Sequence, residues 1–335
     1  MRALAILAGA LALAATAAGC GGGDDGGPLT IYSGREEELV APLFEMFTEE
    51  TGTEVEVRYG DSAELAATIA EEGENSPADV FFAQDPGSLG SVEDQLAQLP
   101  GETLDRVDHP FRDSNGRWTG TSGRSRVIVY NTDVVTEDEV PDRVADLIDP
   151  KWEGRIGIAP TNASFQAFIT GMRLSEGDEA TRQWLTDLKD LSPKIYESNT
   201  PAVEAAASGE IDLGLVNHYY LYLVKEEQPD APIANHFLAA GDPGALVSVA
   251  GAAVLESSDQ SEEAESFVDF LLSEDAQRFY VDEAEEAEYP LIEGIEPKEG
   301  LPPLDELQGP DVDLSSFGAE LEATVEMLRE TGYLT

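Results

Sequence analysis

The feature that most constrains the fold is a repeated alternation of short apolar runs with longer amphipathic segments. Near the start of the chain, the runs LTIY (29–32), VEVRYG (55–60) and ADVFFAQD (78–85) have the composition of β-strands. A helical pattern of apolar residues separates each run from the next. Strands that alternate with helices are typical of a parallel sheet covered by helices, so the chain is predicted to have an α/β fold.

The same alternation continues to the end of the chain. Further strands are expected at 125–131, 155–162, 211–217 and 245–255. Further helices are expected at 163–175, 178–190, 201–208, 218–227, 262–272, 274–281 and 315–331. Ser62 is expected to cap an earlier helix that ends by Gly73. With 335 residues, the chain is long enough for two domains of ordinary size.

The first residues are predicted to be a targeting segment and not part of the fold. Residues 1–19 combine a positive start at Arg2 with a stretch of small apolar residues, as a secretory signal does. The stretch ends in Ala-Ala-Gly before Cys20, which resembles a bacterial lipobox and implies a lipid on this cysteine. The alternative is a free cysteine in a leader. Residues 20–27 are predicted to be a flexible linker that tethers a soluble domain.

The charge balance excludes one class of partner. The chain has 68 acidic and 19 basic residues and a net charge of −49, so a nucleic-acid backbone would be repelled. An acidic, solvated surface is the simplest interpretation of this balance, and attraction of cations is the other.

Motifs of catalysis are missing from the sequence. The three histidines, His109, His218 and His236, do not have metalloprotease spacing, and no nucleophile elbow, P-loop or dinucleotide-binding glycine motif is found. The single cysteine excludes a cysteine-based zinc site. We therefore predict that the protein is not an enzyme. A secreted hydrolase that uses His218 is the less favoured alternative.

Polar stretches follow the predicted strands at the points where those strands end. They are SGRE (33–36), AQD (83–85), PTNAS (160–164), SNT (198–200) and NHYY (217–220). Ligands of open α/β sheets bind at the carboxyl ends of the strands. The sequence therefore predicts a binding site between two lobes, built from these five stretches.

Within the last stretch, Tyr219 and Tyr220 are adjacent at a predicted strand-to-helix turn. Phenols have a pKa of about 10 and are normally neutral, but a trivalent cation can bind the deprotonated oxygen because the ion dominates the local charge. Hard cations prefer oxygen ligands. The pair could therefore hold ferric iron. The alternative is that one ring packs in the core while the other forms a hydrogen bond at the surface.

Several stretches together resemble a known family. They are IYSGRE (31–36), SPADVFFAQ (76–84), SGRSRVIVYN (122–131), KWEGRIGIAPTN (151–162), NHYY (217–220), DPGALVSVAGAAVL (242–255), FVDFLLS (267–273) and AEYPL (287–291). In this order they resemble bacterial ferric-ion-binding proteins, the extracellular solute-binding components of ABC-type iron(III) transporters. The resemblance implies a two-lobed, periplasmic-binding-protein-like (type II) fold with an interlobe cleft. It also implies that Tyr219 and Tyr220 bind Fe³⁺ with a synergistic anion.

The resemblance also implies further ligands of the metal. In part of the family, a histidine on the first loop and an acid after the third strand complete the iron shell; Glu36 and Gln84 stand at these positions. Glu36 can donate oxygen, whereas Gln84 is a poor ligand for Fe³⁺. Glu36 could instead complement the dipole of the helix that follows it.

The resemblance implies an anion site made from two groups of residues. One branch of the family holds carbonate with arginines that match Arg35 and Arg124. Another branch holds phosphate, and its donors match Asn162, Ala163, Ser164, Asn199 and Asn217. The alternatives are ordinary structural roles: surface ion pairs for the arginines, helix caps for Asn162, Ser164 and Asn199, and a turn for Asn217.

The resemblance divides the mature chain between two lobes. The N-terminal lobe is expected to use 28–124 plus 248–298, and the C-terminal lobe 125–247 plus 299–335. The implied function is that of a monomeric lipoprotein, anchored through Cys20 outside the cytoplasmic membrane, that delivers ferric iron to an ABC permease. The alternative cargo is another small solute, such as a phosphorylated metabolite, a polyamine or another metal.

Overall fold

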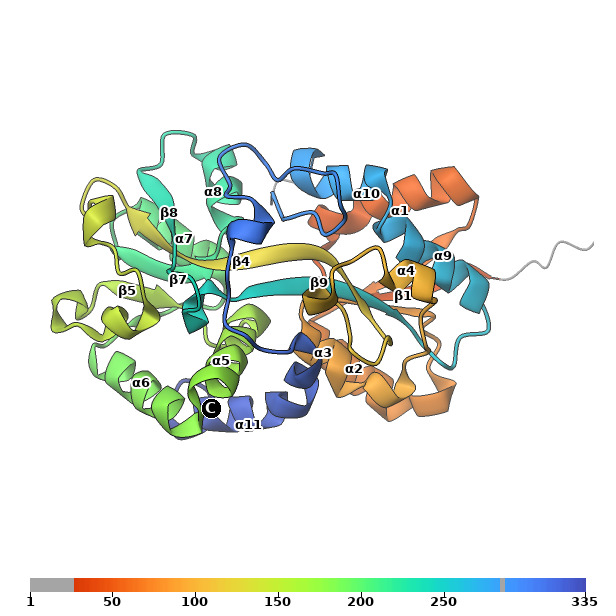
Figure 1. The fold of residues 1–335 in the computed structure, drawn as a ribbon, viewed down its shortest axis with the longest axis horizontal. Helices are drawn as coiled ribbons and strands as arrows, with labels where there is room; N and C mark the ends of the chain where they lie inside the picture. The colour runs from red at the N-terminus through yellow and green to blue at the C-terminus, as the bar shows by residue number, and fades with distance from the viewer. Residues whose placement is uncertain (1–26, 284–286) are drawn as a thin grey trace, which may run out of the picture.

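The computed structural model describes residues 27–283 and 287–335. Figure 1 shows two lobes side by side, joined by long strands that run from one to the other. The strands are β1 (Leu29–Ser33), β2 (Val55–Tyr59), β3 (Val80–Ala83), β4 (Thr119–Asn131), β5 (Ile156–Ile158), β6 (Lys194–Ile195), β7 (Leu213–Asn217), β8 (Ile233–Phe237) and β9 (Val247–Val254). The α-helices are α1 (Glu37–Thr51), α2 (Ser62–Glu72), α3 (Pro86–Ser91), α4 (Gly101–Leu104), α5 (Ala163–Glu176), α6 (Asp178–Asp190), α7 (Asn199–Ala207), α8 (Tyr220–Glu227), α9 (Ser261–Leu271), α10 (Glu274–Arg278) and α11 (Phe317–Glu330).

The sheet is parallel at its two ends and antiparallel in its middle. The strand order is β2-β1-β3-β9-β4-β7-β5-β6, and β8 pairs with β4. Strand β1 pairs in parallel with β2 and β3, and β5 does so with β6 and β7. Strands β9 and β4 are antiparallel to their neighbours. The α/β prediction is confirmed, and each lobe has a mixed sheet.

Strand β4 passes from one lobe to the other. Residues 119–125 pair with β9, and residues 126–131 pair with β7 and β8. All thirteen residues of β4 are buried. Because alternate residues of a strand face the same side, Ser122, Arg124 and Arg126 share one face at this crossing. The crossing strand therefore presents two cations and a hydroxyl between the lobes.

Each lobe has its own aromatic core. In the first lobe, Phe47 lies 5.1 Å from Phe267 and 5.5 Å from Phe270, measured between ring centroids. In the second lobe, Phe168 packs edge-to-face on Trp184 at 5.7 Å. Burying each of these side chains contributes roughly 1.5–3 kcal/mol. A further apolar cluster joins the two lobes, because it contains Leu89 of α3, Ala167 of α5 and Phe317 of α11.

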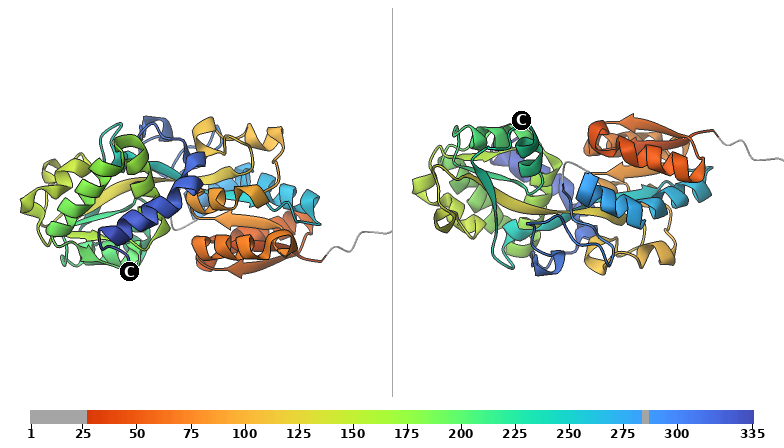
Figure 2. Two further views of the ribbon diagram at one scale, coloured as in Figure 1. Left: turned by 90° about the horizontal axis from the view of Figure 1, so that it is seen from below. Right: turned by 90° about the horizontal axis from the view of Figure 1, so that it is seen from above.

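Helix α11 contacts both lobes. It packs against α3 of the first lobe and against α5 of the second. Figure 2 shows α11 in dark blue, lying between the green and the orange parts of the ribbon. Helix α11 therefore connects the two lobes. The assignment of 299–335 wholly to the C-terminal lobe remains a prediction.

The helix and strand pattern of the sequence is largely reproduced, but the short elements α3, α4 and β6 were not expected. Strand β4 begins at Thr119, six residues earlier than expected, and β8 was not expected. The predicted cap of α2 is wrong, because Asp61 is the N-cap and its carboxylate accepts hydrogen bonds from the N–H groups of Ala63 and Glu64. The hydroxyl of Ser62 instead accepts a hydrogen bond from Gln84 N, at 2.9 Å.

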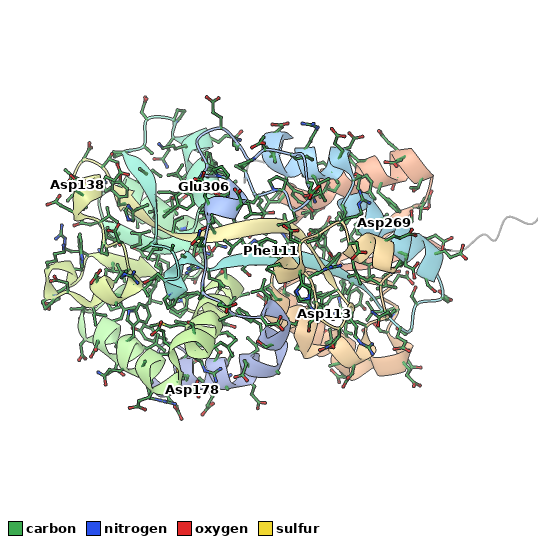
Figure 3. The ribbon with its side chains drawn as sticks, viewed as in Figure 1. Phe111, Asp113, Asp138, Asp178, Asp269 and Glu306 are labelled. Carbon is green, nitrogen blue, oxygen red and sulfur yellow. The ribbon has the colours of Figure 1, made fainter. Side chains whose placement is uncertain are left out.

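The surface carries the acidic excess. The side chains of Asp138, Asp178 and Glu306 are exposed, and Figure 3 shows Asp138 and Asp178 at the edge of the molecule. Among the described residues, no helix has the length and apolar character needed to cross a membrane.

Candidate metal centre

The turn after β7 places two phenols side by side. Strand β7 ends at Asn217, Tyr219 already has helical angles (φ −71°, ψ −26°), and α8 begins at Tyr220. The two ring centroids are 4.3 Å apart. Tyr219 is fully buried and Tyr220 is 7% exposed, which contradicts the alternative that one ring lies at the surface. The turn therefore buries two adjacent phenol rings in contact with each other.

A buried cation lies beside the phenols. Arg126 donates hydrogen bonds to Ser164 Oγ (3.0 Å), Asn217 Oδ1 (3.3 Å) and Leu215 O (2.8 Å). In the described part of the chain, no carboxylate lies within ion-pair distance of its guanidinium. Burial lowers the pKa of Arg126 to about 9, although Tyr220 and Tyr219 act in the opposite direction. A buried positive charge without a carboxylate partner favours an anion as its ligand.

Four of the predicted anion-binding residues form one network with Arg126. Ser164 Oγ donates to Asn162 Oδ1 (2.6 Å) and accepts from Asn199 Nδ2 (3.2 Å). Asn162 caps α5, and Asn199 is the first residue of α7. The buried Nδ2 of Asn217 has no hydrogen-bond partner among the described residues. The interpretation of Asn162 as a helix cap is thus confirmed, and the side-chain amide of Asn217, which Arg126 contacts through Oδ1, keeps an N–H donor that a ligand could use.

The other predicted arginines hold a carboxylate of the chain itself. Arg124 contacts Glu288 Oε1 through Nη2, at 2.8 Å, and Arg35 contacts Glu288 Oε2 through Nη1, at 3.1 Å. All three side chains are almost completely buried. The guanidinium of Arg124 also lies 6.0 Å from the centroid of the Tyr219 ring, within cation–π range. Arg124 is therefore next to Tyr219.

His218 positions this region through both of its ring nitrogens. Its Nδ1 accepts a hydrogen bond from Ser125 N (3.2 Å), so its Nε2 carries the proton and donates to Ala287 O (3.0 Å). The ring also lies 5.7 Å from Tyr219 and 4.8 Å from Tyr289, between centroids. With both nitrogens bonded to backbone groups, His218 has no nitrogen available as a general base, which argues against the hydrolase alternative.

The remaining predicted residues have other surroundings. Glu36 is exposed at the N-cap of α1 and makes no capping hydrogen bond, so its role as a ligand stays a prediction. The carbonyl of Gln84 accepts a hydrogen bond from Arg124. Ala163 is the half-buried first residue of α5. Cys20 lies outside the described residues.

Two functional candidates, Arg126 and Glu288, were missed in the sequence. Arg126 stands two residues after Arg124, and this spacing signals a shared face once the segment is known to be a strand. Glu288 lies in the AEYPL motif but is 164 residues from Arg124, so no local pattern indicates their contact. A cavity of about 680 Å³ beside this motif, lined among others by Phe111 and Tyr289, includes no predicted site residue.

The described residues contain no cluster of three or more histidine, cysteine, aspartate or glutamate side chains that could hold a metal ion. Tyrosine is not among the residue types of such clusters, so the role of Tyr219 and Tyr220 as metal ligands stays a prediction.

The burial of His218 predicts a pH dependence of stability. Desolvation lowers its pKa to about 4, below the ordinary value near 6.5, so the unfolded chain binds the proton first as pH falls. The free energy of unfolding should therefore decrease as the pH is lowered. This residue should account for up to about 2 kcal/mol of the decrease between pH 6.5 and 5. Chemical denaturation of the wild type and of His218→Gln at both pH values measures this contribution. An equal pH slope in the two proteins would contradict it.

Comparison with known proteins identifies the family. Residues 75–308 match the model of the bacterial extracellular solute-binding proteins. The chain is 34% identical, over 310 residues, to the major ferric iron-binding protein of Neisseria meningitidis serogroup B, covering 91% of this chain and 92% of that protein.

Solved structures of iron-bound proteins have the same fold as this chain. Iron-bound HitA from Pseudomonas aeruginosa has a TM-score of 0.86 at 36% identity, covering 91% of this chain and 99% of that one. A Trichodesmium protein in complex with iron and citrate ligands has a TM-score of 0.79 at 27% identity, covering 92% and 100%. The type II fold predicted from the sequence motifs is thereby confirmed. The chain belongs to the bacterial extracellular solute-binding protein family, and the ferric-ion-binding proteins are its relatives.

Proposed function

We propose that this protein captures Fe³⁺ outside the cytoplasmic membrane, together with a synergistic anion, and delivers it to an ABC permease. The names of the relatives and the iron in HitA support ferric iron as the cargo. The role is one of binding and transport without catalysis, in keeping with a family of solute-binding proteins.

Tyr219 and Tyr220 supply the metal ligands in this proposal. A trivalent ion favours deprotonation of both phenols, because its charge outweighs the cost of two phenolates in a buried site. Hard phenolate oxygens match hard Fe³⁺. Two phenolates leave the ion with a charge of +1 and with open coordination positions. Glu36 is the candidate for a further oxygen ligand.

A small oxyanion completes the charge balance, and Arg126 is the observation that carries this part of the proposal. Arg126 is buried beside both phenols and has no carboxylate partner in the described chain. The free amide donor of Asn217 and the first turn of α5, which begins after Asn162, add donors for an anion. Phosphate or carbonate has the size and charge for such a pocket.

The net charge and the predicted lipid anchor are consistent with a membrane-anchored protein that binds cations. The net charge of −49 attracts cations over the distance of a Debye length, which is about 8 Å at physiological salt. A lipid on Cys20 would hold the monomer near its permease.

A ferric titration tests the proposed function. Adding ferric citrate to the metal-free protein at neutral pH should produce a visible phenolate-to-iron absorption band that saturates at one equivalent. The control is ferrous iron under anaerobic conditions, which should give no such band. A protein that stays colourless and yet binds phosphate tightly would instead favour an anion as the cargo.

A further inference from the structure

The segment 287–291 carries a carboxylate into the centre of the molecule. Glu288 is fully buried. Its Oε1 accepts from Arg124 Nε (3.2 Å) and Nη2 (2.8 Å), and its Oε2 accepts from Arg35 Nη1 (3.1 Å) and Ser122 Oγ (2.6 Å). The two oxygens therefore receive four hydrogen bonds, three of them from guanidinium groups, which is how a free planar oxyanion would be held.

Backbone contacts on both sides fix the position of Glu288. Gly123 and Tyr289 exchange two hydrogen bonds of 2.8 Å, from N to O in each direction. The carbonyl of Ala287 accepts the Nε2–H of His218. Ala287 itself has a φ of +51°, a left-handed angle that is costly for a residue other than glycine. Contacts from both lobes hold this strained backbone in place and aim the carboxylate at the arginines.

Glu288 is held as a carboxylate. Burial alone would raise the pKa of Glu288, but Arg35, Arg124 and the hydroxyl of Ser122 outweigh burial and lower the pKa well below that of an ordinary glutamate. The arginine pair is therefore neutralised in part by the chain, whereas Arg126, two residues along β4, has no such partner among the described residues.

We propose that Glu288 is an internal anion that fills the place a free carboxylate-like oxyanion would take between Arg35 and Arg124. It thereby determines anion specificity, because it occupies the arginine pair and directs the exogenous anion to the pocket at Arg126. This inference rests on the proposed function for its consequence in iron binding, but the occupancy of the arginine pair can be tested without iron.

The test is chemical rescue of the metal-free protein. Glu288→Ala removes the carboxylate and leaves a space of about the size of acetate between two buried cations. The melting temperature of this variant should be lower than that of the wild type in sodium chloride. It should rise by about 5 °C when acetate or bicarbonate replaces chloride at equal ionic strength and pH. The wild type should shift by less than about 1 °C.

Two further variants make the outcome decisive. Glu288→Gln fills the same space without the charge, so it should be destabilised and should gain nothing from acetate. Glu320→Ala is the matched control, because it removes a carboxylate from the buried Arg173 at the surface of α11, and acetate should not stabilise it more than the wild type.

Three results would overturn the inference. They are a Glu288→Ala protein that acetate and bicarbonate stabilise no more than the control, one that is unfolded in every salt, and a Glu288→Gln protein as stable as the wild type. The ferric titration separates the two proposals. If acetate rescues Glu288→Ala but the wild type does not bind Fe³⁺, Glu288 is an internal anion and the proposed iron transport is wrong. If the wild type binds Fe³⁺ but acetate does not rescue Glu288→Ala, the proposed function stands and the internal anion is wrong.

Discussion

Replacing both Tyr219 and Tyr220 by phenylalanine should abolish ferric binding and the visible band. The substitution removes two oxygens that would carry negative charge next to a trivalent ion, and it leaves the buried rings and their 4.3 Å contact nearly unchanged. Each single substitution is expected to weaken binding by at least about a thousand-fold, which corresponds to about 4 kcal/mol. Competition against a chelator of known iron affinity measures this loss.

The control for this experiment is Tyr222→Phe. Tyr222 lies on the same helix, α8, and is partly buried, and its contact with Lys298 uses the face of the ring and not the hydroxyl. This variant should keep the band and the affinity. Should the double variant bind iron as the wild type does, with its fold intact, other residues must hold the metal and the proposed centre is wrong.

The second large effect is expected from Gly318→Ala, which should lower the stability of the protein by about 3 kcal/mol. Gly318 lies in the first turn of α11, directly against α3. A Cβ at this position would lie 2.2 Å from the carbonyl carbon of Gly90 and 2.6 Å from the nitrogen of Ser91. Both are backbone atoms, so no side-chain rotation relieves the clash and the two helices must separate.

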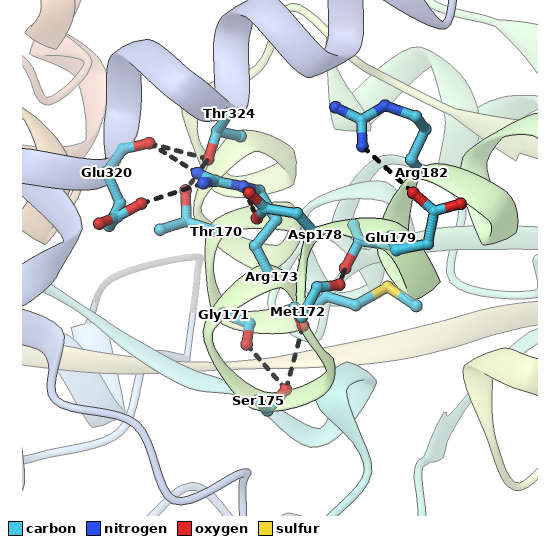
Figure 4. A network of polar contacts seen from close by, with 12 residues as sticks. Thr170, Gly171, Met172, Arg173, Ser175, Asp178, Glu179, Arg182, Glu320 and Thr324 are labelled. Carbon is cyan, nitrogen blue, oxygen red and sulfur yellow. Dashed lines mark hydrogen bonds and ion pairs between the residues drawn. The ribbon is translucent and has the colours of Figure 1, made fainter.

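Contacts further along α11 prevent an easy adjustment. Arg173 of α5 donates to Glu320 Oε2 (3.0 Å) and to Thr324 Oγ1 (2.9 Å), and Thr170 and Thr324 share a hydrogen bond of 2.7 Å. Figure 4 shows these bonds between α5 and α11. Because α11 is fixed on α5, moving it away from α3 breaks contacts in one lobe or the other.

Thermal unfolding measures this prediction, with Gly101→Ala as the matched control. Gly101 is helical and does not have a positive φ, and a methyl group on its Cα would have no neighbouring atom within 4 Å. Alanine at this position should therefore be neutral or slightly stabilising. The melting temperature of Gly318→Ala should fall by about 8 °C. If the two variants have the same melting temperature, the close contact between Gly318 and Gly90 does not contribute to stability and the prediction is wrong.

Much of the fold could be predicted because helices and strands have local periods. The apolar spacing in residues 37–51 and the run at 213–217 each fix one element and its buried face, whatever lies elsewhere in the chain. The turn between Asn217 and Tyr220 followed from the same patterns, whereas the burial of both phenols did not. The segment TGTSGR (119–124) gave no such signal, because a polar, glycine-rich stretch is a strand only where neighbours bury it.

The sequence by itself determined the α/β class, the acidic surface and the adjacency of Tyr219 and Tyr220 at the end of a strand. Only the tertiary structure decided which charges meet. Arg124 pairs with Glu288 across 164 residues, and Arg126, on the same face of β4, is left without a carboxylate in the described chain. The physical reason is that burial and partners set the role of a charged side chain, and both depend on packing between segments that are distant in sequence.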